Sequence, residues 1–212
     1  MEPTTKRIVQ LDSGDEKEEI LARRGVFFLQ HEIEDCSSYM FCNEAIGSKL
    51  NGCFKERSMT VVLNTPGGNI QHGLAIYDTI RMLVASGTDV HVVGLGLVAS
   101  MGTVIMQAAS RRIATPYTQF LVHQLSMTID YYKSEEVTEV EERANEAKRL
   151  NDIVMGIIAD HTGVGLEELK SRCTKKNLWM GAEAALKFGS KGLIDEVAEL
   201  PACIARAFKD VP

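Results

Sequence analysis

Apolar positions along the chain follow two alternating patterns, which predict its secondary structure. Short continuous apolar runs alternate with longer segments in which apolar residues recur every three or four positions. The strand-like and helical segments come in three successive pairs: 26–29 and 37–50, 59–63 and 70–84, and 90–95 and 101–109. This order is typical of right-handed crossover units around a largely parallel sheet. We therefore expect an α/β fold.

Two further short strands are predicted beyond the third pair, at 112–114 and 119–122. Thr115-Pro116-Tyr117 lies between them and indicates a turn, because proline fixes the backbone there. A short helix is expected at 166–172, and another begins near Ala182.

A long amphipathic helix is predicted at 134–161. Its apolar stripe comprises Val137, Val140, Ala144, Ala147, Leu150, Ile153, Val154, Ile157 and Ile158, with acidic and basic residues between them. At about seven turns the helix is long for a small domain. Two interpretations stay open: the stripe packs on the parent domain, or the helix projects and forms a subunit interface.

Composition excludes several classes of protein. The chain has 212 residues, 45% of them hydrophobic, which is enough for one sizeable core. Its net charge of −6 and the lack of long Lys or Arg runs argue against nucleic-acid binding. No window approaches the roughly 20 apolar residues of a spanning helix, and no signal peptide is apparent, so we expect no membrane partner. The five cysteines are scattered without a C-x-x-C pair, and we expect no metal and no cofactor.

Ser100 is the first candidate for chemistry. It lies in Gly96-Leu97-Val98-Ala99-Ser100-Met101-Gly102, between an apparent strand and an apparent helix. Small neighbours allow a sharp turn that exposes a serine hydroxyl beside the amides of a helix start. The alternative is that the serine is only a helix N-cap, which is common at such junctions.

Two other predicted strand ends favour the catalytic interpretation. His123 ends the run 119–122, and the glycine-containing loop 64–68 follows the run 59–63. Parallel strands that end at one edge of a sheet would bring a nucleophile, a base and a glycine loop together. This combination is typical of a serine hydrolase.

Six motifs in this order resemble the ClpP family, the proteolytic subunits of Clp proteases. They are Asn64-Thr65-Pro66-Gly67-Gly68, Ala75-Ile76-Tyr77-Asp78-Thr79, the Ser100 turn, His123-Gln124, His161-Thr162-Gly163 and Gly192-Leu193-Ile194-Asp195. The resemblance extends over about 26–199. It implies a crotonase-like, ClpP-like α/β fold with a projecting handle helix, 134–161. The domain boundaries expected are an N-terminal segment at 1–24, a head domain at 25–199 and a C-terminal tail at 200–212.

The resemblance also implies site residues. Ser100 would be the nucleophile and His123 the general base, while the backbone amides of Gly68 and Met101 would form the oxyanion hole. Gly67 and Gly68 lack a Cβ, so substrate could approach the backbone closely.

The third catalytic position departs from the family, because Asn177 stands where an aspartate is expected. An asparagine oxygen can orient a histidine Nδ1–H but supplies no negative charge to stabilise the imidazolium. Loss of the carboxylate from a Ser-His-Asp centre can cost about 10⁴ in rate. Asp195 is a weaker substitute, since its apolar lead-in resembles an ordinary core strand.

The function expected from this resemblance is a serine endopeptidase subunit that hydrolyses unfolded polypeptides or peptides inside a double-ring chamber. Seven subunits would form a ring, as a homo- or hetero-oligomer, and two rings a tetradecamer that works with an AAA+ Clp ATPase. The location would be cytoplasmic, or an organelle matrix or stroma, or the cytoplasm of a phage-infected cell. The main alternative is a non-catalytic or weakly active ring subunit. A crotonase-type acyl-CoA enzyme shares the fold, but its chemistry gives Ser100 and His123 no role.

Overall fold

A single seven-stranded sheet organises the chain, in a computed structural model that describes residues 20–52, 58–126 and 136–207. The main path runs β1 (Val26–Gln30), β2 (Ser58–Thr65), β3 (Asp89–Ala99), β4 (Arg111–Ala114) and β7 (Glu196–Val197). Every pair on this path is parallel. Off the path, β5 (Gln119–Val122) pairs in parallel with β3, and β6 (Leu178–Gly181) pairs antiparallel with β5.

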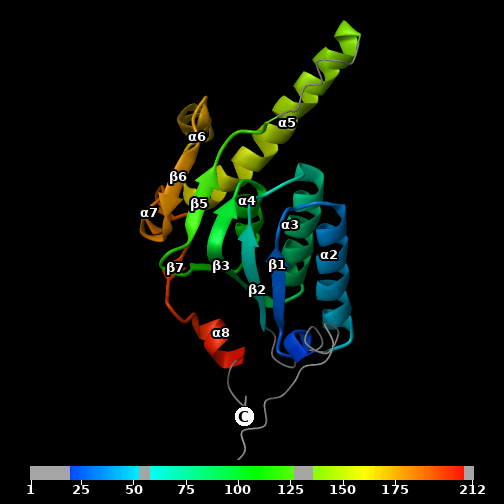
Figure 1. Cartoon of the computed structure of the whole chain (residues 1–212), viewed down its shortest axis with the longest axis vertical. Coiled ribbons are helices and arrows are strands. Elements are labelled where there is room, and N and C mark those ends of the chain that lie inside the picture. Colours follow the sequence, from blue (N-terminus) through cyan, green and yellow to red (C-terminus); the bar gives the residue numbers. More distant parts are fainter. Residues whose placement is uncertain (1–19, 53–57, 127–135, 208–212) are drawn as a thin grey trace, which may run out of the picture.

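The helices of the described residues are α2 (Asp35–Leu50), α3 (Ile70–Ala85), α4 (Met101–Met106), α5 (Val137–Thr162), α6 (Leu166–Cys173), α7 (Ala182–Leu186) and α8 (Ala202–Ala207). The first three connect successive parallel strands, as the sequence pattern predicts. Helices α2 and α3 lie side by side against β1 and β2 (Figure 1). The predicted α/β class with a mostly parallel sheet is confirmed, whereas β6 was not predicted.

Strand β3 is longer than the predicted run 90–95, and this corrects the expected glycine turn. The strand continues through Gly96, whose φ is +75°, to Ala99. Its first half pairs with β4 and its second half with β5, and the β2–β3 register shifts where this change occurs. A glycine at positive φ allows the strand to bend and change partner without ending.

Helix α4 is shorter than the predicted segment 101–109, since it ends at Met106. The chain must return to the sheet at β4, and Ser110 N–H already donates to the Val90 carbonyl at 2.8 Å. Gln107 is fully buried just after the helix, where its amide donates to the Thr103 carbonyl. These bonds end the helix at Met106, although the next residues after Gln107, Ala108 and Ala109, are still apolar.

Two apolar clusters cover the two faces of the sheet. The larger one joins α2, α3, α4 and the C-terminal half of α5 to alternate residues of the strands, such as Val61 and Val92. The smaller one comprises Val93, Ile113 and Cys203, with Ile204 packed against them. Helix α8 therefore covers part of the second face.

Helix α5 projects from the rest of the molecule (Figure 1). Its buried residues, which include Met155 and Ile158, all lie in its C-terminal half. In its first turn, Val137 and Val140 are 75% and 50% exposed. Of the two interpretations of the apolar stripe, packing on the parent domain therefore applies only to the C-terminal half.

Some predictions fall on other parts of the chain. The candidate strand at 125–132 lies largely outside the described residues, and 125–126 are not in a strand. Of the expected N-terminal segment, 1–24, the structure describes the part from residue 20 onward, and residues 20–23 are helical. Among the described helices, none is both long and apolar enough to cross a membrane.

Candidate active site

Ser100 sits at a sharp turn between β3 and α4, with φ 54° and ψ −120°. A positive φ is unfavourable for a residue with a Cβ and persists only where the surroundings enforce it. Here Ser100 N–H donates to the Leu121 carbonyl of β5 at 2.8 Å, which fixes the turn to the sheet. Ser100 occupies the N-cap position of α4, but its hydroxyl makes no capping bond there, so capping by the side chain does not explain this serine.

The glycine loop after β2 lies directly against this turn. A Cβ on Gly67 would stand 2.5 Å from Ser100 Cβ and 3.0 Å from the Met101 nitrogen, and the φ of Gly67 is +99°. Only a residue without a side chain fits there. Met101 N–H opens α4 and has no acceptor within its helix, so it is available at the site.

Side chains on both sides hold the loop in place. The Thr65 hydroxyl accepts a hydrogen bond from Gly67 N–H at 3.1 Å. The Asn69 side chain caps α3 by accepting from the N–H groups of Gln71 and His72, at 2.8 and 3.2 Å. Gly68 bridges to Ile33, and a Cβ there would overlap the Ile33 carbonyl.

His123 follows β5 and lines the same small cavity as Ser100. The cavity measures about 30 Å³, and its remaining wall is mostly apolar. It is lined by Ile70, Ser100, Met101, Thr103, Val104, His123, Leu125, Val154, Met155 and Ile158. The sheet thus brings the predicted nucleophile and base to one site, although no hydrogen bond joins their side chains in the described structure.

The imidazole of His123 is oriented by the main-chain carbonyl of the next residue, Gln124. Its Nδ1 lies 2.7 Å from the Gln124 carbonyl oxygen, so this nitrogen carries the proton and donates. Nε2 is then the free basic nitrogen, which is the tautomer that a serine hydrolase requires. No sequence pattern predicts this contact, because every residue carries a main-chain carbonyl.

Asn177 lies just before β6, the antiparallel neighbour of β5, and its side chain is exposed. Leu178 pairs with Val122, so Asn177 comes near the end of β5 where His123 begins. Within the described residues, no hydrogen bond connects Asn177 to His123. The site as described brings Ser100, His123, Gly67, Gly68 and Met101 together and leaves Asn177 at its edge.

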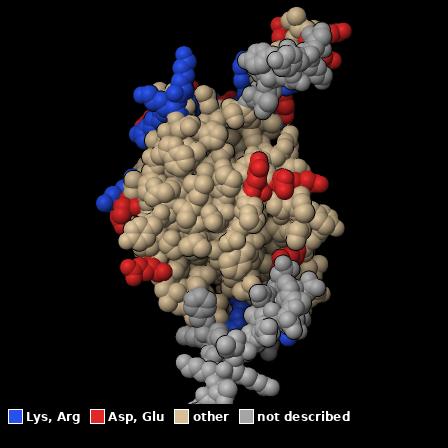
Figure 2. Space-filling view, in the orientation of Figure 1, with Lys and Arg blue, Asp and Glu red and all other residues tan. Residues whose placement is uncertain are grey.

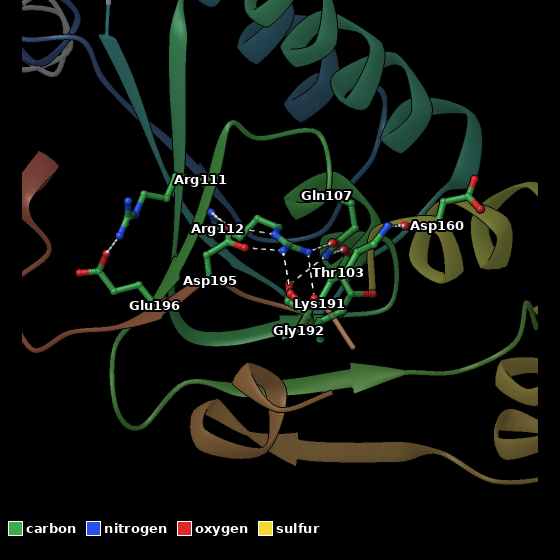
Figure 3. A network of polar contacts seen from close by, with 10 residues as sticks. Thr103, Gln107, Arg111, Arg112, Asp160, Lys191, Gly192, Asp195 and Glu196 are labelled. Carbon is green, nitrogen blue, oxygen red and sulfur yellow. Dashed lines mark hydrogen bonds and ion pairs between the residues drawn. The ribbon is translucent and has the colours of Figure 1, made fainter. Parts of the chain in front are cut away.

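Asp195 is engaged elsewhere and is not a substitute acid for His123. Its carboxylate accepts from the Arg112 main-chain N–H at 2.8 Å and forms an ion pair with the guanidinium (Figure 3). Burial opposes ionisation, but the contacts with Arg112 outweigh it and hold the pKa of Asp195 below its ordinary value. Arg112, 8% exposed, also donates to the Gln107 side chain and the Gly192 carbonyl. This network fastens β4 to the segment before β7.

Comparisons with known proteins match nearly the whole chain. The family model described as Clp protease matches residues 11–201. Three relatives carry the name ATP-dependent Clp protease proteolytic subunit 2. The one from Thermobifida fusca is 31% identical over 181 residues, 84% of this chain and 82% of the relative. Those from Nocardia farcinica and Corynebacterium diphtheriae are 28% and 27% identical over 187 and 199 residues, covering 87% and 91% of this chain and 87% and 94% of theirs.

The chain belongs to the Clp protease family. It is thus a ClpP-like proteolytic subunit of the serine peptidase type. In the described parts of this chain, no group of three or more His, Cys, Asp or Glu side chains is placed to hold a metal ion.

Proposed function

We propose that this Clp-family subunit is an endopeptidase that cleaves unfolded polypeptides or peptides through Ser100, His123 and Asn177. The observation that carries the proposal is the strained Ser100 turn, because an ordinary loop serine has no reason to adopt φ 54°. The turn supports a nucleophile whose hydroxyl faces the site shared with His123.

In the proposed mechanism, Nε2 of His123 removes the Ser100 hydroxyl proton as Oγ attacks the scissile carbonyl. The developing oxyanion accepts hydrogen bonds from the N–H groups of Gly68 and Met101. His123 then gives its proton to the leaving amine, and water hydrolyses the acyl-enzyme with His123 again as base. The apolar wall beside Ser100, which includes Ile70 and Met155, supports a preference for apolar side chains in the substrate.

Asn177 has a defined task in this proposal. When the imidazole becomes an imidazolium, the Gln124 carbonyl and the Asn177 amide oxygen are neutral acceptors for its Nδ1–H. Neither supplies the full negative charge of an aspartate, so we expect proton transfer to be slower than in a Ser-His-Asp centre. Asn177→Asp should therefore raise kcat.

The same proposal includes assembly into rings. The projecting half of α5 carries exposed Val137 and Val140. Residues other than Lys, Arg, Asp and Glu cover most of one face of the molecule, with acidic side chains in its right-hand part and further charged side chains at its margins (Figure 2). Large apolar side chains exposed elsewhere include Phe28, Tyr39, Met40, Met82 and Trp179. These surfaces support a double ring joined through α5 and closed by lateral contacts, which would enclose Ser100 in a chamber fed by an AAA+ Clp ATPase.

The experiment is to treat the purified chain and its Ser100→Ala variant with a fluorophosphonate probe and a fluorogenic peptide, with and without a Clp-type ATPase. We expect labelling and cleavage in the parent and neither in the variant. Cleavage that survives Ser100→Ala would overturn the proposed nucleophile. The assembly state of both proteins, measured by sedimentation, serves as the control for folding.

A second candidate function is a ring subunit with little or no activity. It is favoured by one observation: His123 Nδ1 is bound to the main-chain carbonyl of Gln124, while Asn177 is exposed. In that case the assembled parent would be neither labelled nor active, and Asn177→Asp alone would restore no labelling. Labelling of the parent would exclude this candidate.

A further inference from the structure

A second cluster of reactive side chains lies on the opposite face of the sheet, beneath α8. Along β2 and β3, alternate residues such as Val61 and Val92 belong to the main core, so Thr60 and His91 face the other way. The parallel register places Thr60 directly beside His91. Cys203 lies in α8, which packs on this face of the sheet, and is 7% exposed.

The contacts within this cluster resemble those that activate a thiol. His91 Nε2 lies 2.9 Å from a carboxylate oxygen of Asp89, and Nδ1 is buried without an ordinary hydrogen-bond partner. Cys203 packs against Val93, which lies two positions after His91 on the same face of β3, so its thiol and the unpartnered Nδ1 belong to one buried cluster. A thiol beside an imidazole that a carboxylate orients can lose its proton to the ring.

The electrostatics agree with this geometry. The contact with Cys203 raises the pKa of His91; burial opposes this and the charge of Asp89 adds to it. Burial alone would raise the pKa of Cys203, but the contacts with His91 and Thr60 bring it below the ordinary value. The neighbouring cation on β4, Arg111, is paired with Glu196 at 2.7 Å, so its charge is largely balanced.

We propose that Cys203 is a reactive thiolate paired with the His91 imidazolium, and that it is a site of modification by hydrogen peroxide. The thiolate sulfur attacks one peroxide oxygen, an S–O bond forms and the O–O bond breaks. The leaving hydroxide takes the proton of the His91 imidazolium and departs as water. The products are the sulfenic acid of Cys203, water and a neutral His91.

Two of the other described cysteines provide controls within the same molecule. Cys173 is buried like Cys203, but burial raises its pKa and its thiol donates to the Val122 carbonyl at 3.8 Å. Cys36 is exposed, and its sulfur faces the Met40 thioether. If exposure of the thiol to solvent decides its reactivity, Cys36 should be modified faster. If activation of the thiol by a neighbouring histidine decides it, Cys203 should be modified faster.

The test is to treat the full chain with hydrogen peroxide at pH 7 in the presence of dimedone and to quantify each cysteine by peptide mass spectrometry. We expect Cys203 to be trapped at least about tenfold faster than Cys173 and faster than Cys36. His91→Asn should lower the Cys203 rate about tenfold, and Asp89→Asn should lower it less. Trapping of Cys203 at the Cys173 rate, or an unchanged rate in His91→Asn, would overturn the proposal.

Two further measurements keep the test decisive. Asp89 is exposed, so Asp89→Asn reports on the cluster even if His91→Asn does not fold. Between pH 6 and 8, iodoacetamide should alkylate Cys203 at a nearly constant rate, whereas the rate for Cys173, whose pKa is raised by burial, should rise with pH. A Cys203 rate that rises in parallel with that of Cys173 contradicts a preformed thiolate. None of these readouts depends on peptidase activity, so their failure would leave the proposed function untouched.

Discussion

At Ser100, the backbone conformation and the neighbouring glycine depend on each other. The Ser100 Cβ occupies space that only a glycine at position 67 leaves free. A residue with φ 54° stores strain, and the surrounding hydrogen bonds must hold it in place. The conformation of Ser100 therefore depends partly on a glycine, which has no side chain, and on main-chain hydrogen bonds.

Gly67→Ala tests this dependence. The added methyl group would meet Ser100 Cβ at 2.5 Å, so either the loop or the serine turn must move away from the oxyanion position. Loss of one oxyanion donor costs about 10²- to 10³-fold in rate, and we expect kcat/KM to fall by about 100-fold. Peptide hydrolysis and fluorophosphonate labelling measure the change.

Gly47→Ala is the matched control for this substitution. Gly47 lies inside α2, and a Cβ there would meet nothing within 4 Å. Alanine is the better helix former, so this variant should be fully active and up to about 1 kcal/mol more stable. Full activity in Gly67→Ala would show that the glycine loop does not shape the site.

The Arg112–Asp195 pair gives a pH-dependent prediction. Because the pKa of Asp195 is depressed in the folded state, its contribution to stability is present at neutral pH and is lost as the pH falls through the folded-state pKa. Asp195→Asn should lower the free energy of unfolding at pH 7 by about 2 kcal/mol, since it leaves the buried guanidinium without its counter-charge. Urea unfolding at pH 7 and pH 3 should show the difference between parent and variant shrinking at pH 3.

Glu196→Gln is the control for that prediction. The Arg111–Glu196 pair lies next to the first one on the same strands, but the Arg111 side chain is 54% exposed. An exposed pair contributes at most about 1 kcal/mol, and its loss should be small at both pH values. Equal losses in the two variants would contradict a special role for burial of Arg112.

At the level of elements, α5 consists of two halves that differ in burial. The C-terminal half packs into the main core through side chains such as Ile158, 2% exposed, whereas the first turn exposes Val140. Ile158→Ala should destabilise the protein by about 3 kcal/mol, because it removes buried volume. Val140→Ala should change stability by less than about 0.5 kcal/mol.

Urea unfolding of both variants at one protein concentration measures the contrast, since assembly adds to apparent stability. Equal losses of the free energy of unfolding in the two variants would mean that the first half of α5 also packs within the subunit.

The elements also show which parts of the secondary structure could be predicted from sequence patterns. Strands β1 and β2 were predictable from their apolar runs, and helix α3 from its regular apolar face. The apolar face of α2 is weaker, because Ser38 and Ser48 are buried beside Phe41 and Ala45.

The extension of β3 was not predictable, since it depends on a change of partner at Gly96 from β4 to β5. The early end of α4 was also missed, because buried Gln107 donates to the carbonyl of Leu193, which is far away in the sequence, and accepts from Arg112 on β4.

For the molecule as a whole, the sequence predicted which strand ends meet but not their finer contacts. Ser100, His123 and the glycine loop follow three neighbouring strands, so the parallel topology alone brings them to one edge. The contact of His123 with Gln124 and the pairing of Asp195 with Arg112 were not predictable, as neither has a local pattern. The catalytic role of Asn177 stays a prediction.

Assembly through α5 gives the last prediction, at the scale of the whole particle. If the exposed stripe of α5 is buried between rings, Val140→Glu places a carboxylate in an apolar contact, where an unpaired charge is strongly unfavourable. We expect the variant to sediment as a smaller assembly than the parent and to lose peptidase activity with it. Thr138→Glu adds the same charge to an exposed position off the stripe and should sediment like the parent. If both variants sediment like the parent, α5 does not join the rings, and the chamber must be closed by other surfaces.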